Sequence, residues 1–456
     1  MSTPTSHPGR ALEKSSSRWL LPLIILAAFA IRMVVVFFTY RDLPDADKFY
    51  ERFGWEMGWV ARALASGHGF TSPYWPWSGP TALEPPLYIG LLSVVFRLFG
   101  IYSLTSAFVI LSINSLLSSL TCIPVYFSAK YSLGARGAKY AAWVWAFYPF
   151  AIYFSACRVW EYSLTGLLFT TSFCIAQRIH RTANPLAWMA WGALAGLTAL
   201  SNPSTLSTLP FLAGVAAWQL RKAELPKPSR RWLLNFVLTG LAAAAVLTPW
   251  TVRNYHALGV ICPVRDNIWL EIYADNFGNA PQDDSSPPSA DNRPYPASSP
   301  VEMRKYLAMG ETAYLADKHA LSLQDFHQHH QYGFLIGHTL RRFLYYWTGY
   351  WSFSSKELQD QPTEPAMVFY IGCVTLLMLR GIHRFWRLNR AALLPYLVLL
   401  IFFPFTYYLT NPLMDYRQAI EPAVIVLALA GIVPWKRLNP ADSSRWIGAE
   451  PSASPG

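Results

Sequence analysis

The sequence predicts an all-α polytopic membrane protein with about ten transmembrane helices and two structured loops on the outer membrane face. Three observations support this prediction. Of the 456 residues, 53% are hydrophobic, 16% are aromatic and only 14% are charged, unlike an ordinary soluble chain. Apolar runs long enough to cross a bilayer recur along the chain. The Lys and Arg residues are concentrated in alternate connections between those runs, as the positive-inside rule requires.

About ten apolar runs are candidate spans, of which the fifth and the eighth are short for that role. The first run follows three basic residues, is too long for a cleaved signal peptide and lacks a small-residue cleavage site. We therefore expect a retained signal-anchor span. The runs cover residues 19–39, 103–127, 139–156, 161–177, 186–201, 204–220, 232–250, 365–379, 391–410 and 418–435.

The charge distribution predicts the orientation of the chain. If the N-terminus is inside, the inner connections hold most Lys and Arg residues, and the short outer connections hold only Arg158 and Arg417. This alternation explains the net charge of +11 without a nucleic-acid partner. The five cysteines are an odd number and most lie in or beside apolar runs, so no disulfide framework is predicted. We expect a multi-pass inner-membrane protein with both termini in the cytoplasm.

The predicted organisation alternates membrane segments with outer-face loops. Long structured loops on one membrane face usually carry binding or chemistry. The first such loop holds an apolar stretch broken by Arg97, as in an interfacial helix, and the second turns helical from Val301 to Trp347. The segments are a cytoplasmic tail (1–18), a transmembrane core (19–250) with a catalytic first outer loop (41–102), a large outer-face loop (251–363), C-terminal transmembrane helices (364–435) and a cytoplasmic tail (436–456).

Charged residues at the outer ends of spans are candidates for chemistry, because a charge near hydrocarbon is costly unless it is paired, hydrated or used. By the predicted topology these residues all face the outer surface. Alternatives remain: a helical ion pair for two of them three residues apart, and snorkelling for the arginines. Arg32, inside the first span, is expected to snorkel. The candidates are Glu56, Arg158, Glu161, Arg253, Arg417 and Glu421.

The stretch WTVRNY follows Pro249, which we expect to end a span, and the chain continues as RDNIWLEIYADNFGNA. Guanidinium forks and amides suit a phosphate or sugar hydroxyls. An ordinary hydrogen-bonded surface loop is the alternative. The side chains of this kind are Arg253, Asn254, Arg265, Asn267 and Asn276.

Two short motifs resemble metal sites, but neither predicts one. Asp45-Ala46-Asp47 matches the acidic pair that binds a metal-nucleotide sugar in soluble transferases, yet nucleotide sugars are inside the cell and this pair is outside. The FHQHHQ stretch has three histidines but no nearby Cys, which favours a solvated helix surface. Gly67-His68-Gly69 lacks the setting of a nucleotide loop and is interpreted as a turn.

Several stretches, in order and spacing, resemble the GT-C superfamily of integral membrane glycosyltransferases, in its protein O-mannosyltransferase-like branch. Together they cover about residues 19–435. The resemblance implies a transferase that takes a sugar from a polyprenyl-phosphate carrier at the outer face. The stretches are AAFAIRMVVVF, WEMGWVARALASGHGF, GPTALEPPLYIGLLSVVFRLFG, RVWEYSL, LTALSNPSTLSTLP, TPWTVRNYHALGV and DYRQAIEP.

The resemblance also implies roles for single residues. The essential acid of the first outer loop maps onto Glu56, with Asp47 and Glu51 as alternatives. Some lipid-A-modifying relatives have Lys where this chain has Glu84, so their phosphate contact does not transfer. The predicted catalytic residues are Glu56, Glu161 and Asp47. The predicted substrate- or phosphate-binding residues are Arg62, Arg158, Asn202, Arg253, Asn254, Arg265, Asn267 and Arg417.

The mechanism we expect is a one-step, inverting transfer. The leaving phosphate gains negative charge, and the cationic side chains expected to stabilise it are those of Arg253, Arg417 and Arg158. Glu56 takes the proton of the acceptor hydroxyl. No cofactor is required; a divalent metal is compatible with this chemistry but is not predicted. The partners are a polyprenyl-phosphate sugar, membrane lipid and an unknown hydroxyl acceptor on a lipid, glycan or protein. A transporter or lipid-carrier flippase is the alternative, and a non-catalytic scaffold is a third.

Overall fold

The computed structural model describes residues 8–41, 53–74, 77–223, 230–277, 294–329, 332–354, 359 and 362–432. The predicted catalytic residue Asp47, its alternative Glu51 and the Asp45 of the acidic motif lie outside these ranges. His330 also lies outside them, and of His329 only the backbone is described.

The regular secondary structure of the described residues is helical, and their one strand-like feature is an isolated bridge between Thr71 and Pro80. The all-α prediction is confirmed. The first half comprises α1 (Pro8–Arg41), α2 (Glu56–Ala65), α3 (Pro86–Phe99), α4 (Leu104–Leu120), α5 (Cys122–Ala146), α6 (Pro149–Ala156), α7 (Tyr162–Ala176), α8 (Pro185–Ala199), η3 (Pro203–Thr208), α9 (Leu209–Ala223) and α10 (Arg231–Leu258).

The second half begins with helices of the predicted outer loop and returns to long apolar helices. It comprises α11 (Ile268–Asn276), α12 (Pro300–Met309), α13 (Glu311–His329), α14 (Tyr332–Thr348), α16 (Glu364–Leu388), α17 (Arg390–Phe402), α18 (Phe405–Leu409), η5 (Met414–Ala419) and α19 (Glu421–Ile432).

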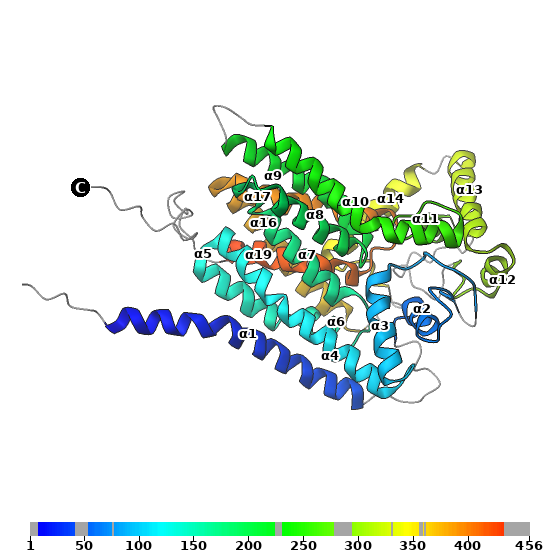
Figure 1. Ribbon diagram of the computed structural model, residues 1–456, viewed down its shortest axis with the longest axis horizontal. Coiled ribbons are helices and arrows are strands. Elements are labelled where there is room, and N and C mark those ends of the chain that lie inside the picture. Colours follow the sequence, from blue (N-terminus) through cyan, green and yellow to red (C-terminus); the bar gives the residue numbers. More distant parts are fainter. Residues whose placement is uncertain are drawn as a thin grey trace, which may run out of the picture.

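Most of the helices lie alongside one another as a bundle, and α2, α3, α11, α12 and α13 gather at one end of it (Figure 1). α1 begins and α19 ends at the opposite end (Figure 1). Residues from the two predicted outer loops therefore meet at the same end of the bundle. The predicted segment boundaries themselves stay predictions.

Five helical segments in the described ranges are long and apolar enough to cross a membrane. The chain is therefore an integral membrane protein. The predicted number of about ten spans stays a prediction. The five segments are Trp19–Thr39, Leu104–Ala146, Arg231–Leu258, Glu364–Leu388 and Arg390–Leu409.

α5 folds back on itself at Gly134, which has φ 79° and interrupts the helical conformation. The second half then returns along the first. Trp145 Nε1 donates to the carbonyl oxygen of Ser118 at 2.8 Å, and Cys122 Sγ lies 3.8 Å from the carbonyl oxygen of Ala142. The reversal separates two of the predicted apolar runs, residues 103–127 and 139–156.

Glycines allow two helix pairs to pack backbone against backbone. A Cβ on Gly192 of α8 would collide with the carbonyl oxygen of Thr239 in α10, and one on Gly381 of α16 with that of Leu427 in α19. Small residues at such contacts are typical of helix packing in membranes, where close approach of backbones provides the attraction.

Two predicted helix boundaries are wrong. α10 continues through Pro249 to Leu258, so the WTVRNY stretch lies in the helix and not after it. Proline is tolerated within membrane helices where neighbouring helices support the backbone. On either side of Pro249, the hydroxyl groups of Thr248 and Thr251 donate to the carbonyl oxygens of Ala244 and Leu247. The eighth apolar run is part of the 25-residue helix α16. Basic residues in the C-terminal half of α16 make the apolar run in the sequence shorter than the helix.

The snorkelling prediction for Arg32 is also wrong. Its side chain is fully buried among α1, α4 and α5. Nη1 donates to the carbonyl oxygens of Ala146 (2.8 Å) and Ala28 (3.0 Å), and Nε donates to Ser118 Oγ at 3.2 Å. Ala146 ends α5, so the guanidinium compensates the carbonyl groups and the negative dipole end of that helix.

Replacing Arg32 with Leu is expected to lower the free energy of unfolding by about 2–4 kcal/mol, because buried carbonyl groups at the end of α5 lose their donor. Thermal unfolding in detergent measures this. Val34→Leu is the control, since Val34 lies on the same helix and is 50% exposed. Equal melting temperatures for the two variants would contradict a structural role of Arg32.

Candidate functional site

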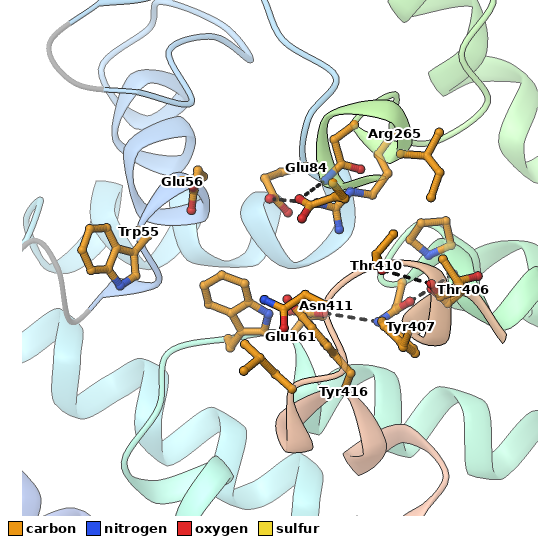
Figure 2. Close-up of a pocket in the computed structure, with 18 of the residues that line it drawn as sticks. Trp55, Glu56, Glu84, Glu161, Arg265, Thr406, Tyr407, Thr410, Asn411 and Tyr416 are labelled. Atoms are coloured by element: carbon orange, nitrogen blue, oxygen red, sulfur yellow. Dashed lines mark hydrogen bonds and ion pairs between the residues drawn. The ribbon is translucent and has the colours of Figure 1, made fainter. Parts of the chain in front are cut away.

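A cavity of about 560 Å³ lies at the end of the bundle where α2, α3 and α11 gather (Figures 1 and 2). Its walls come from segments far apart in the chain. They include residues at the start of α2, before α3, before α7, at the start of η3, around α11, and in α18 and η5. Its polar and aromatic lining includes Trp55, Glu56, Glu84, Trp160, Glu161, Asn202, Arg265, Asn267, Glu271, Tyr295, Thr410, Asn411, Tyr407 and Tyr416.

Several helices begin at the cavity. Glu56 is the first residue of α2, and Glu161 and Asn267 directly precede α7 and α11. The N-terminus of a helix presents unpaired N–H groups and partial positive charge, which favour an anion. The cavity therefore combines acidic side chains with backbone ends that suit a negatively charged group.

Arg265 is the cationic side chain among the described residues of the cavity lining. Its Nη2 lies 3.2 Å from Glu84 Oε1, and its Nε donates to the carbonyl oxygen of Leu83 at 2.9 Å. Figure 2 shows Glu84 and Arg265 together on one side of the cavity, with Glu161, Tyr407 and Tyr416 across from them. The acids thus surround a single guanidinium.

Glu161 is buried at the opposite wall. Asn202 Nδ2 lies 3.4 Å from Glu161 Oε1 and 3.4 Å from the hydroxyl group of Tyr407. Glu161 Oε2 has no hydrogen-bond partner among the described residues. Tyr407 stacks on Tyr416 with ring centroids 4.7 Å apart. This wall offers a carboxylate oxygen and aromatic faces to a bound molecule.

The surroundings shift the pKa values of the cavity acids. Burial, with the nearby carboxylate of Glu84, raises the pKa of Glu56 to about 8. Burial raises the pKa of Glu84 to about 7, although the Arg265 guanidinium works against that rise. Burial lowers the pKa of Arg265, but the carboxylates of Glu84 and Glu271 outweigh it, so the guanidinium stays charged. Glu56 is therefore an acid that can exchange a proton near neutral pH.

The cavity brings together five predicted site residues. The structure places them in its lining although they are spread over more than two hundred residues of sequence. They are Glu56, Glu161, Asn202, Arg265 and Asn267. Their predicted roles in catalysis and binding stay predictions.

Two predicted binding residues hold loop backbone instead of lining the cavity. Arg253 donates to the carbonyl oxygens of Thr81 (2.6 Å) and Phe70 (2.5 Å). Asn254 is buried and donates to the carbonyl oxygen of Cys262 at 2.9 Å. Both side chains thus join the end of α10 to loops at the cavity end of the bundle.

Three further arginines also lie outside the lining. Arg417 is buried, pairs with Glu421 (Nε–Oε1 2.5 Å) and lies over the ring of Trp347. Arg62 lies over the ring of Trp77, 4.4 Å from its centroid. Their predicted phosphate contacts stay predictions, as does that of Arg158.

Arg158 does not form the helical ion pair with Glu161 that the sequence left open. Arg158 is exposed and lies over the ring of Tyr153, while Glu161 faces the cavity and bonds Asn202.

Sequence reasoning missed several lining residues. Glu84 was noted only because it departs from a family pattern and was not predicted as a site residue. Glu271 was not singled out. Glu271 follows Asn267 by four residues, and Asn267 Nδ2 donates to Glu271 Oε1 at 2.9 Å, so helical spacing was a usable signal. Tyr407 and Tyr416 carried no signal, since aromatic residues are common at membrane interfaces.

Gly54 allows the start of α2 to approach the segment that ends at Glu161. Its φ is 82°, and a Cβ there would lie 2.5 Å from the carbonyl oxygen of Val159 and 3.3 Å from the ring of Trp160. Only glycine adopts this φ without strain, and the contact is too close for any side chain. Gly54 therefore controls the distance between the walls that carry Glu56 and Glu161.

Replacing Gly54 with Ala is expected to destabilise the fold by about 1–3 kcal/mol and to displace α2 from the cavity. Thermal unfolding of the purified protein measures the first effect. Gly90→Ala in α3 is the matched control, because no atom lies within 4 Å of a Cβ there and Ala favours helix. If both variants melt like the wild type, Gly54 does not set this contact.

The described residues include no group of three or more His, Cys, Asp or Glu side chains placed to hold a metal ion. The prediction that no metal is required is not tested by this arrangement, and it stays a prediction.

No protein-family model matches this chain, and its sequence matches no curated protein. Solved structures are similar in fold. The Archaeoglobus fulgidus oligosaccharyltransferase in complex with Zn and sulfate has a TM-score of 0.50 at 14% identity, over 90% of this chain and 48% of that chain. The same organism's oligosaccharyltransferase AglB, with an inhibitory peptide and a dolichol-phosphate, also has a TM-score of 0.50 at 14% identity, over 91% and 50%.

ArnT from Cupriavidus metallidurans bound to undecaprenyl phosphate matches with a TM-score of 0.36 and 13% identity, over 90% of this chain and 77% of that chain. The present chain spans about half the length of the two oligosaccharyltransferase chains. The chain therefore shares the fold of these archaeal oligosaccharyltransferases, and the expected resemblance is confirmed at the level of fold alone.

Proposed function

We propose that this protein is a membrane glycosyltransferase that moves a hexosyl or pentosyl group from a polyprenyl-phosphate donor to a hydroxyl acceptor. One observation carries the proposal most directly: the cavity combines a guanidinium, proton-exchanging carboxyl groups and helix N-termini at one end of a membrane helix bundle. The fold supports the same class, because an oligosaccharyltransferase with this fold was solved with a dolichol-phosphate. The protein O-mannosyltransferase-like branch is part of the proposal.

Arg265 binds the donor phosphate in this proposal. When the bond between the sugar and the phosphate oxygen breaks, the phosphate passes from one negative charge towards two. A fixed guanidinium and the N-termini of α2, α7 and α11 stabilise that increase more in the transition state than in the ground state. No metal has to supply this charge.

Glu56 is the general base. Its carboxylate takes the proton of the acceptor hydroxyl as the acceptor oxygen attacks the anomeric carbon, and the lipid phosphate leaves with the electron pair of the broken bond. This single displacement inverts the anomeric centre. Glu161 and Asn202, on the opposite wall, orient sugar hydroxyls by hydrogen bonds, and Tyr407 and Tyr416 pack against the sugar ring.

The test is transfer of a labelled sugar from a polyprenyl-phosphate donor in vesicles that contain the purified protein and a pool of candidate lipid and glycan acceptors. Label leaving the donor for a hydroxyl acceptor supports the proposal. Retention of all label on the donor across every donor sugar tried would refute it, provided that the protein is folded.

The rate should rise with pH, because the base acts in its ionised form. With its pKa at about 8, Glu56 is mostly protonated at pH 6, so we expect kcat to rise about tenfold per pH unit there and to level off above pH 8.

The free energy of unfolding should fall with rising pH over the same range. The pKa of Glu56 in the folded protein lies above its ordinary value of 4.5, so the contribution of Glu56 to stability is favourable below pH 4.5 and is lost as the pH rises through 8. Rate and melting profiles of wild type and Glu56→Gln measure both effects; a rate that falls from pH 6 to 8 would contradict them.

A lipid-carrier flippase is the second candidate. Transporters usually bind substrate near the middle of the bilayer, between repeated halves. The position of this cavity at one end of the bundle favours an enzyme instead (Figure 1). Movement of labelled carrier across vesicles without sugar transfer would favour the flippase.

We infer further that the cavity end of the bundle faces the outside of the inner membrane and that both termini are cytoplasmic. Ser66→Cys tests this, because Ser66 is exposed at the end of α2 and its φ of −82° accepts a side chain without strain. An impermeant thiol reagent applied to intact cells with a permeable outer membrane should label this variant more than the parent protein. Labelling only after lysis would reverse the orientation.

A further inference from the structure

Glu84 is held in a fixed position against Arg265. The carboxyl group is buried, with 4% of the residue exposed. The large predicted outer loop fixes the backbone before it: the side chain of Glu311 accepts a hydrogen bond from the amide of Ala82, and Arg253 donates to the carbonyl oxygen of Thr81, both at 2.6 Å. The contact between Glu84 and Arg265 is therefore part of the fold and not a chance surface pairing.

Arg265 has donors left for a ligand. Nε and one Nη2 hydrogen are engaged by Leu83 and Glu84, and no hydrogen bond from Nη1 is found in the described part of the chain. Guanidinium groups commonly bind phosphate through two parallel N–H groups. A phosphate on Arg265 must then lie beside the Glu84 carboxylate or take its place. In both arrangements two anions compete for one cation.

The charge balance makes this competition depend on the charge of the ligand. The lining carries Glu56, Glu84, Glu161 and Glu271 against Arg265. A phosphodiester adds one negative charge, whereas a phosphate monoester adds between one and two near neutral pH and a diphosphate adds more. Repulsion from a carboxylate a few ångströms away grows with each added charge, and the low local dielectric strengthens it.

We infer that Glu84 is a specificity-determining residue that shares Arg265 with the donor phosphate and so selects a singly charged polyprenyl phosphodiester over more highly charged lipid phosphates. This inference rests on the proposed function. After transfer, the carrier is a phosphate monoester with additional negative charge. Repulsion between this phosphate and the Glu84 carboxylate promotes release of the carrier.

The experiment compares lipid binding to wild type, Glu84→Gln and Glu84→Ala in nanodiscs at pH 8 by native mass spectrometry. The probes are undecaprenyl methyl phosphate (one charge), undecaprenyl phosphate (about two charges) and neutral undecaprenol. We expect wild type to bind the singly charged lipid about tenfold more tightly than the doubly charged lipid, and both variants to reduce that ratio to about threefold or less. The variants should also bind undecaprenyl phosphate more tightly than wild type does.

Glu302→Gln is the control, since Glu302 is a buried, ion-paired glutamate outside the cavity lining, 2.6 Å from Lys318 Nζ. It should leave the ratio unchanged. An unchanged ratio in both Glu84 variants, or weaker binding of undecaprenyl phosphate by them, would overturn the inference. Failure of wild type to bind either lipid phosphate more tightly than undecaprenol would instead refute the proposed donor, whatever Glu84 does.

Discussion

Glu56→Gln is expected to lower kcat for sugar transfer by a factor of about 10²–10⁴, because the acceptor hydroxyl loses the group that takes its proton. The substitution keeps the size of the side chain and removes only the ionisable oxygen. Binding of undecaprenyl methyl phosphate should change by less than about threefold, since Arg265 and not Glu56 holds the phosphate in the proposal. Single-turnover transfer, alongside equilibrium lipid binding, separates the two effects.

Asp317→Asn on α13 is the control for the Glu56 substitution, because it neutralises an acid that does not line the cavity. It should retain wild-type turnover. Full turnover of Glu56→Gln would remove Glu56 as the base. If Glu161→Gln then lost activity by the larger factor, the base would be on the opposite wall.

Arg265→Gln is expected to lower kcat/KM by a factor of about 10² or more, because the leaving phosphate loses its fixed positive charge. The same change leaves the buried carboxylate of Glu84 without its partner, which costs about 3–5 kcal/mol of stability for a buried pair and less for one that faces a cavity. Transfer kinetics and thermal unfolding must therefore be measured together.

The double variant Arg265→Gln with Glu84→Gln distinguishes chemistry from folding. Removing both charges should restore most of the melting temperature and none of the transfer rate. Recovery of activity together with stability would mean that Arg265 only supports the fold. Arg265→Lys should be intermediate, since it keeps the charge but loses the planar fork.

The sequence predicted the fold class because the bilayer imposes a strong pattern. Apolar runs of fixed length and loops of alternating charge follow from the cost of charges and unpaired backbone groups in hydrocarbon. The same reasoning failed at Pro249 and Arg32. Both would be unfavourable on an isolated helix, and only the neighbouring helices, which the sequence does not reveal, make them acceptable.

The cavity was predictable only in part, for a physical reason. Acids and amides at predicted span ends, such as Glu56, Glu161 and Asn202, do meet there. Whether an arginine lines the cavity or binds backbone depends on the direction in which its helix or loop orients the side chain. Arg253 and Arg265 looked equivalent in sequence, yet one holds the carbonyl oxygens of Thr81 and Phe70 while the other faces the cavity.

A structure of the protein with undecaprenyl methyl phosphate bound in a nanodisc would show where the donor phosphate binds. We expect the phosphate in the cavity, within hydrogen-bond distance of Arg265, with the Glu56 carboxylate facing the open side from which an acceptor enters. A phosphate bound instead at Arg253, Arg158 or Arg417, with the cavity unchanged, would contradict it.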